Sequence, residues 1–284
     1  MHTGTVGRLI AVVLFVAVLV PGVVLARAWG LAAGRRAVAT AAVQFAEPTA
    51  QGLAALARQA DHARRVRRVG FLLGVAAIVG SVVLFAEASV FLWIPALAVG
   101  LLLGVVLAED TQPWPRWRLT SPPRRPRRSE QISPWLVWVM RAVVAAEVAT
   151  ALGMYRADEL SGPVVPVALV PPLVAWALAE VALLRILVHS LPAAGEDVPV
   201  DEALRTWTAH LVTASASVLG LLPLGALLLV AGIELGDRIT EGFDLLPVAL
   251  VAGGFSALAA GLAVIGFLFP WLRPVRSGVR ALAG

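Results

Sequence analysis

Three charged side chains interrupt long apolar stretches of this sequence, and they are the residues best placed to do chemistry there. They are Arg141, Glu147 and Glu180. A charge at membrane depth costs about 2.5–3.5 kcal/mol on insertion scales, so such residues are usually paired or functional. Arg141 and Glu180 fall at similar depths in neighbouring stretches, which predicts an ion pair between them. The pair is interpreted either as a structural clamp or as a substrate or proton site.

Glu147 lies nearer the middle of its apolar stretch and has no obvious partner in the sequence. It is the best single candidate for a functional residue, as a group that exchanges protons, and the alternative is a neutral acid facing another helix. Prolines in the following stretches, such as Pro171 and Pro223, either break helices around a cavity or simply kink them. Glu87 and Glu109 fall at the ends of apolar stretches, where hydration at the interface explains them.

Several classes of catalyst are excluded by residues that the chain lacks. It contains no cysteine, which removes thiol catalysis, disulfides and cysteine-ligated metals. All 23 basic residues are arginine, so there is no lysine for a P-loop or a Schiff base. His189 and His210 flank one loop and could in principle hold a haem or metal, but hydrated interfacial histidines are the simpler interpretation. We expect no catalytic residue, metal or cofactor, and leave enzymatic activity open while favouring its absence.

The composition places these residues in a membrane protein. Hydrophobic residues make up 59% of the 284 and charged residues 14%, against about 45–50% and 25% in soluble domains. A membrane helix needs about 20 mostly apolar residues. We therefore predict one all-α transmembrane domain over residues 1–284, a bundle with one leading helix and three helical hairpins. The seven predicted spans are residues 9–26, 69–86, 88–108, 134–154, 163–188, 209–233 and 245–269.

The arginines predict the orientation of these spans. The loops at 27–68, 109–133 and 189–208 would be cytoplasmic, and 20 of the 23 arginines would then lie on the cytoplasmic side. This arrangement puts the N-terminus outside and the C-terminus inside a bacterial plasma membrane. The alternative is a signal peptide cleaved after residue 28, which would invert the alternation.

Internal spacing suggests how the hairpins pack. The second helix of each hairpin has a proline near its start, followed fourteen residues later by a corresponding position: Pro95 and Glu109, Pro166 and Glu180, Pro247 and Gly261. These matches suggest a threefold repeat, although proline near a helix start is common. In the first hairpin, glycines at 70 and 74 should lie at the same depth as glycines at 100 and 104, which would let the two backbones approach closely.

Two arginine-rich stretches could hold anionic lipid headgroups. Residues 53–68 have helical spacing and predict a short amphipathic helix against the inner leaflet, and residues 113–134 are rich in proline and arginine. The alternative is that both are orientation signals only. Membrane topology already explains the basic charge, so we expect no nucleic-acid partner. The candidate lipid contacts are Arg64, Arg65, Arg67, Arg68, Arg124, Arg125, Arg127 and Arg128.

The chain resembles the uncharacterised multi-span membrane proteins that are common in actinobacteria. The resemblance rests on the arginine-only composition, on Leu107-Ala108-Glu109 before a basic loop, and on the segment Val200–Arg205 before an apolar stretch. It implies no known activity. We expect a non-enzymatic accessory or scaffold protein of the cell envelope, with the lipid bilayer and another membrane protein as partners. The alternative is a small transporter or proton-coupled permease that uses the intramembrane charges.

Overall fold

The computed structural model describes residues 34–39, 41–42, 49–85, 93–114, 122–160, 162, 164–192, 195–238 and 245–272. The protein is all-helical, with 87% helix, and the described residues form no strand. The one β-bridge found there pairs Arg124 with Leu191. The predicted first span at residues 9–26 lies outside the described residues, as do Glu87 and the arginines at 27 and 273.

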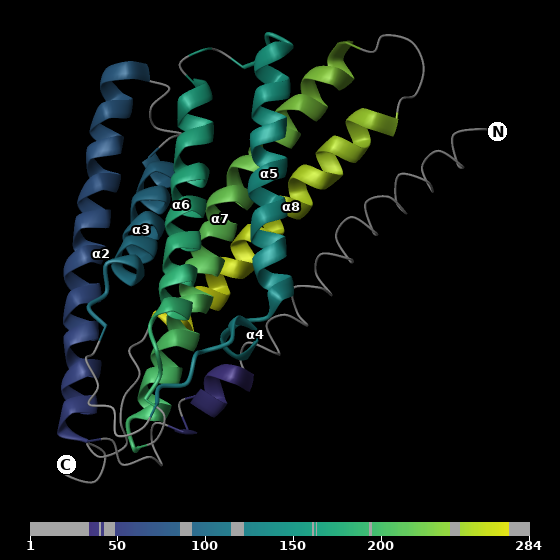
Figure 1. Ribbon diagram of the computed structural model, residues 1–284. Coiled ribbons are helices and arrows are strands. Elements are labelled where there is room, and N and C mark those ends of the chain that lie inside the picture. Colours follow the sequence, from purple (N-terminus) through teal and green to yellow (C-terminus); the bar gives the residue numbers. More distant parts are fainter. Residues whose placement is uncertain are drawn as a thin grey trace.

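The helices follow the predicted spans from the second onward (Figure 1). Five of them, α2, α5, α6, α7 and α8, are long and apolar enough to cross a membrane, which indicates a multi-pass membrane protein. The structure does not confirm the count of seven. The helices are α2 (Ala50–Phe85), α3 (Trp93–Asp110), α4 (Arg128–Gln131), α5 (Pro134–Arg156), α6 (Val164–Val188), α7 (Val198–Arg238) and α8 (Leu245–Trp271).

Helices α2 and α7 are longer than the spans predicted for them. The amphipathic segment at 53–68 is not a separate helix against a membrane surface, because it continues without a break into the apolar half of the 36-residue α2. The segment from Val198 likewise belongs to the 41-residue α7. The junction of α7 contains no glycine or proline, and the single Gly70 at the junction of α2 does not interrupt that helix. In each of these two helices, the polar half and the apolar half therefore form one continuous helix.

All six long helices share one end of the bundle, which we call the basic end. There α2, α5 and α7 begin and α3, α6 and α8 finish, and α4 lies beside them, at the bottom of Figure 1. It also carries the described arginines of the 122–128 segment and of the first half of α2. The opposite end carries Arg156 and Arg238, and Arg238 pairs with Glu159 at 3.0 Å.

Helix α7 forms the centre of the bundle. It packs against α3, α4, α5, α6 and α8, and it is buried without interruption from Ala203 to Leu221. A helix buried on every side needs small or apolar residues all round, which this segment supplies with alanines, serines and threonines. Helices consecutive in the chain also pack as pairs, α2 with α3, α5 with α6 and α7 with α8.

The predicted glycine contact in the first hairpin is confirmed. A Cβ atom added at Gly70 would lie 2.5 Å from Cα of Gly104 and 2.6 Å from the carbonyl oxygen of Gly100. One added at Gly74 would lie 3.1 Å from Cα of Leu97. The two backbones are thus in direct contact, which only residues without a side chain allow. We call this contact the glycine seam.

Candidate functional site

The predicted ion pair between Arg141 and Glu180 is present and joins α5 to α6. The Arg141 guanidinium donates from Nε to Oε1 of Glu180 at 2.6 Å and from Nη2 to Oε2 at 2.8 Å. This bidentate geometry, with two parallel hydrogen bonds, is the strongest that an arginine and a carboxylate form. The guanidinium also lies over the Trp138 ring, 5.4 Å from its centroid, and Arg128 approaches Glu180 to 4.0 Å. Two arginines thus neutralise Glu180, and the pair with Arg141 links α5 to α6.

Glu147 lies apart from that pair. Its side chain is fully buried on the face of α5 that also carries Val144 and Ala151. Neither carboxyl oxygen has a hydrogen-bond partner among the described residues. It follows Arg141 by six residues, or about 9 Å along the helix axis. The three residues singled out in the sequence therefore form one ion pair and one isolated acid rather than a single site.

The level of Glu147 in the bundle coincides with the proline of α7. A Cβ atom at Gly220 would meet Cγ1 of Val143 at 2.9 Å, so these two positions lie side by side. Both helices begin at the basic end, so three or four residues further along each axis bring Glu147 level with Pro223. Pro223 has no N–H, which leaves the Leu219 carbonyl without its helical donor. The buried acid thus lies level with the proline, and the freed Leu219 carbonyl lies about one turn closer to the basic end.

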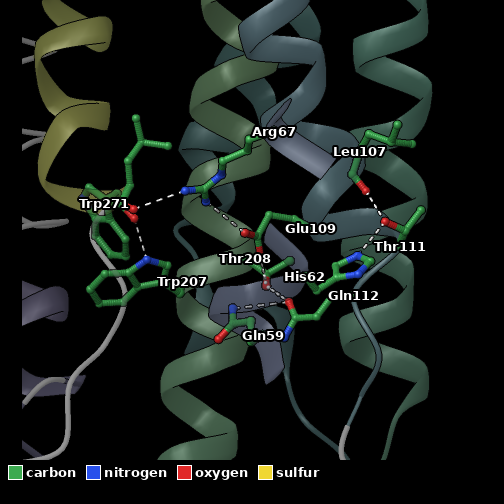
Figure 2. Close-up of polar contacts among 11 residues, drawn as sticks. Gln59, His62, Arg67, Leu107, Glu109, Thr111, Gln112, Trp207, Thr208 and Trp271 are labelled. Atoms are coloured by element: carbon green, nitrogen blue, oxygen red, sulfur yellow. Dashed lines mark hydrogen bonds and ion pairs between the residues drawn. The ribbon is translucent and has the colours of Figure 1, made fainter. Parts of the chain in front are cut away.

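A buried polar network at the basic end is the largest feature that the sequence did not reveal (Figure 2). Its centre is Glu109, which we had expected to be hydrated but which is only 3% exposed. The expectation was wrong because the first half of α2 covers this end of α3. Arg67 lies 3.6 Å from the Glu109 carboxylate, and the Thr208 hydroxyl donates to it at 2.8 Å.

The network around Glu109 joins three helices and the residue that follows a fourth. The Thr208 hydroxyl also lies 3.2 Å from the Gln112 side-chain oxygen, which accepts from Gln59 at 3.4 Å. Arg67 donates to the carbonyl of Leu272 at 3.2 Å. Through these bonds α2 is tied to α3, α7 and the residue that follows α8. Figure 2 shows that the side chains converge on the space between α2, α3 and α7.

Aromatic rings extend this network toward α8. The Trp207 indole donates to the carbonyl of Trp271 at 2.6 Å, and the His210 ring stacks on Trp271 with centroids 4.5 Å apart. His210 is 2% exposed, so it is a packed histidine rather than a hydrated one. His189 is exposed and stacks on Trp114 instead. The described residues contain no group of three or more metal-ligating side chains.

Arg205 closes the end of α6. It is fully buried and pairs with Asp201 at 2.9 Å, and its guanidinium donates to the Ile186 carbonyl. The last carbonyls of a helix have no partner within the helix, so an arginine there satisfies them. Nearby, Arg185 donates to the Gln112 carbonyl at 3.0 Å. The charges of this region thus connect α3, α6 and α7.

The arginines considered for lipid binding divide into two groups. Arg67, Arg124 and Arg128 each approach a carboxylate, which occupies part of their charge. Arg64 pairs with Asp61 on the surface at 2.9 Å. The others are exposed at the basic end: Arg65, Arg68, Arg125 and Arg127.

A recess of about 630 Å³ opens at the basic end beside these arginines. It lies between the helical residues 34–39, α4 and the start of α7. Its charged and polar lining consists of Arg35, Arg124, Glu130, Gln131, Glu202 and Thr206, and the rest is small or apolar. Comparisons with family models, with characterised proteins and with solved structures find no match to this chain. Its function is therefore argued from its own residues.

Proposed function

We propose that this protein crosses a bacterial plasma membrane seven times, with its N-terminus outside and its basic end in the cytoplasm. The excess of arginine at that end supports this orientation. Trp135 and Trp138, at the start of α5, are 62% and 63% exposed, as expected of residues at a membrane boundary.

Reporter fusions test the orientation. A reporter that works only in the cytoplasm should be active when joined after residue 123. A reporter that works only outside should be active when joined after residue 238. A fusion after residue 123 that reports an external location would overturn the seven-span arrangement. A fusion after residue 30 separates this arrangement from the one produced by signal-peptide cleavage, since only the latter places that residue outside.

Within that membrane, we propose that the protein is a non-enzymatic accessory or scaffold subunit of the cell envelope. The observation that carries this proposal is the unbroken burial of α7 from Ala203 to Leu221. Alternating access requires parts of a bundle to move against each other around a site, and a central helix held by five others resists such movement. The pairs Arg141–Glu180, Arg67–Glu109 and Arg205–Asp201 support the proposal, because each bridges helices or caps one.

A subunit of this kind needs a surface for its partner, and α2 offers one. Only 17% of its apolar window is buried, the lowest share among the five helices. Leu72, Val79 and Val83 are each at least 60% exposed on this helix.

The test is native mass spectrometry of the protein released directly from its own membrane. We expect a second protein in fixed stoichiometry, and Val79→Trp on α2 should reduce its amount. Val170→Trp on α6 is the matched control, because Val170 is also exposed and apolar. A protein found only alone or as a homo-oligomer would contradict the accessory role.

The isolated burial of Glu147 favours a second candidate, a small proton-coupled transporter. An unpaired acid in the membrane interior is a functional candidate by default. The test is proton flux into proteoliposomes after a pH jump. Glu147→Gln should abolish the flux, whereas the exposed Glu196→Gln should leave it intact. A flux that Glu147→Gln does not change would remove Glu147 from the mechanism.

A further inference from the structure

The recess at the basic end is lined by an arginine, Arg35, that forms no ion pair with the described residues. Nη1 of Arg35 is buried, and no described residue forms a hydrogen bond with it. Because Arg35 lines the open recess and no described carboxylate pairs with it, its guanidinium favours an anionic group there. Arg35 belongs to the helical residues 34–39, which form one wall of the recess.

The second arginine of the recess is held by acids. Nη2 of Arg124 donates to Glu130 at 2.5 Å, and Nη1 lies 4.0 Å from Glu202. The Glu130 carboxylate therefore compensates most of the positive charge of Arg124. Glu202 keeps a distant contact only, and its side chain is 43% exposed. The lining thus has at Arg35 a guanidinium that no described carboxylate pairs with, and at Glu202 a carboxylate whose charge is only weakly compensated.

This balance of charges selects the kind of ligand. Two guanidinium groups and two carboxylates give the charged lining no net charge, so a plain anion would meet repulsion from the acids as well as attraction from the arginines. A molecule with one anionic and one cationic group satisfies both Arg35 and Glu202. Gln131 and Thr206 add further polar groups to the lining, and the Thr206 hydroxyl donates to the Gln131 side-chain oxygen at 2.8 Å.

The position of the recess suits the headgroup layer of a bilayer. Glu130 and Gln131 precede by a few residues the exposed Trp135 and Trp138, which belong at the membrane boundary. On α7, Thr206 is followed by Trp207, which lies 5.2 Å from the guanidinium carbon of Arg36. The recess therefore lies just beyond the apolar part of the bundle. This placement uses the membrane orientation proposed above but not the scaffold role.

We propose that the recess binds a zwitterion that carries a phosphate and a primary ammonium group, with the phosphate at Arg35 and the ammonium at Glu202. Such a group comes either from an aminophospholipid headgroup or from a free aminoalkyl phosphate. A phosphate accepts several charge-assisted hydrogen bonds from a guanidinium, and an ammonium donates to a carboxylate. The 630 Å³ volume is in the range of small-molecule sites.

The test measures binding to the full chain in detergent after removal of bound lipid. Short-chain phosphatidylethanolamine, short-chain phosphatidylglycerol and phosphoethanolamine are titrated separately by calorimetry. We expect phosphatidylethanolamine to bind about tenfold more tightly than phosphatidylglycerol, because only the former carries the ammonium group. If phosphoethanolamine binds as tightly as phosphatidylethanolamine, the ligand is the free aminoalkyl phosphate. If phosphatidylethanolamine binds and phosphoethanolamine does not, the ligand is the lipid headgroup.

Two variants assign the contacts within the recess. Arg35→Gln should weaken both lipids about tenfold, and Glu202→Gln should weaken phosphatidylethanolamine alone. The exposed Arg65→Gln and Glu196→Gln are the matched controls and should change neither. Unchanged thermal unfolding of the ligand-free variants shows that the bundle is intact. Tighter binding of phosphatidylglycerol than of phosphatidylethanolamine, or wild-type affinity of Arg35→Gln, overturns the proposal.

Discussion

The glycine seam leads to a prediction in which one substitution has opposite effects at two positions of the same helix. Gly70→Ala places a methyl group 2.5 Å from Cα of Gly104, whereas ordinary contact needs at least 3.4 Å. The helices must therefore separate by about 0.9 Å, and the obstacle is backbone that cannot rotate away. Overpacking of this kind costs about 1–3 kcal/mol, against a gain of about 1 kcal/mol in helix propensity. We expect a net loss of about 1 kcal/mol in the free energy of unfolding.

Gly80→Ala is the matched control because Gly80 lies on α2 with nothing within 4 Å of its added methyl group. Only the gain in helix propensity applies there, so the variant should be more stable by about 1 kcal/mol. The assay is reversible unfolding of the full chain in mixed micelles, followed by circular dichroism and by tryptophan fluorescence. The two variants should therefore differ by about 2 kcal/mol with opposite signs. Equal stabilisation of both would show that the α2 and α3 backbones do not touch.

Three further predictions concern the buried charges, and the same unfolding assay measures each of them. Arg141→Met should destabilise the protein more than the double variant Arg141→Met/Glu180→Met, because the single change leaves a carboxylate without its main partner; equal losses would mean that the pair acts as two independent residues. Glu147→Leu should stabilise the bundle by about 1–3 kcal/mol, since it removes a buried carboxyl without a hydrogen bond; a loss of stability would reveal a partner for that carboxyl. Arg205→Met should cost about 3–5 kcal/mol, because it removes the arginine that pairs with the buried Asp201. Asp201→Asn/Arg205→Met should recover part of the loss, so a double variant no more stable than the single one would contradict this account.

The sequence contained the information for local features of this fold. Apolar stretches located α2, α3 and the helices from α5 to α8, because a membrane span must be long and apolar. The depths of Arg141 and Glu180 predicted their ion pair, since both lie inside such stretches where a partner is needed. The spacing of Gly70 and Gly74 predicted the glycine seam, because a hairpin brings glycines of equal depth together.

Contacts between distant segments were not predictable in the same way. Glu109 ends an apolar stretch, and nothing in its neighbourhood shows that the first half of α2 will cover it. Its partners Arg67 and Thr208 come from helices whose relative rotation the sequence does not state. The recess has the same origin, since Arg35 and Glu202 line it together only because α7 extends beyond the predicted span. Polar residues near span ends, such as Gln59 and Gln112, were the only signal available for this region.

The glycine seam also divides α2 into two arms that are attached differently. The helix touches its neighbour most closely at Gly70 and Gly74, and these lie between an arm of about 30 Å toward Ala50 and one of about 16 Å toward Phe85. Near the seam, direct backbone contact sets the distance between the helices. Along the long arm at the basic end, side-chain contacts replace it, from Arg67 to Glu109 and from Gln59 to Gln112. The Thr49 hydroxyl donates to the Asp197 carboxylate at 2.6 Å, and this bond holds the start of the long arm against the segment before α7.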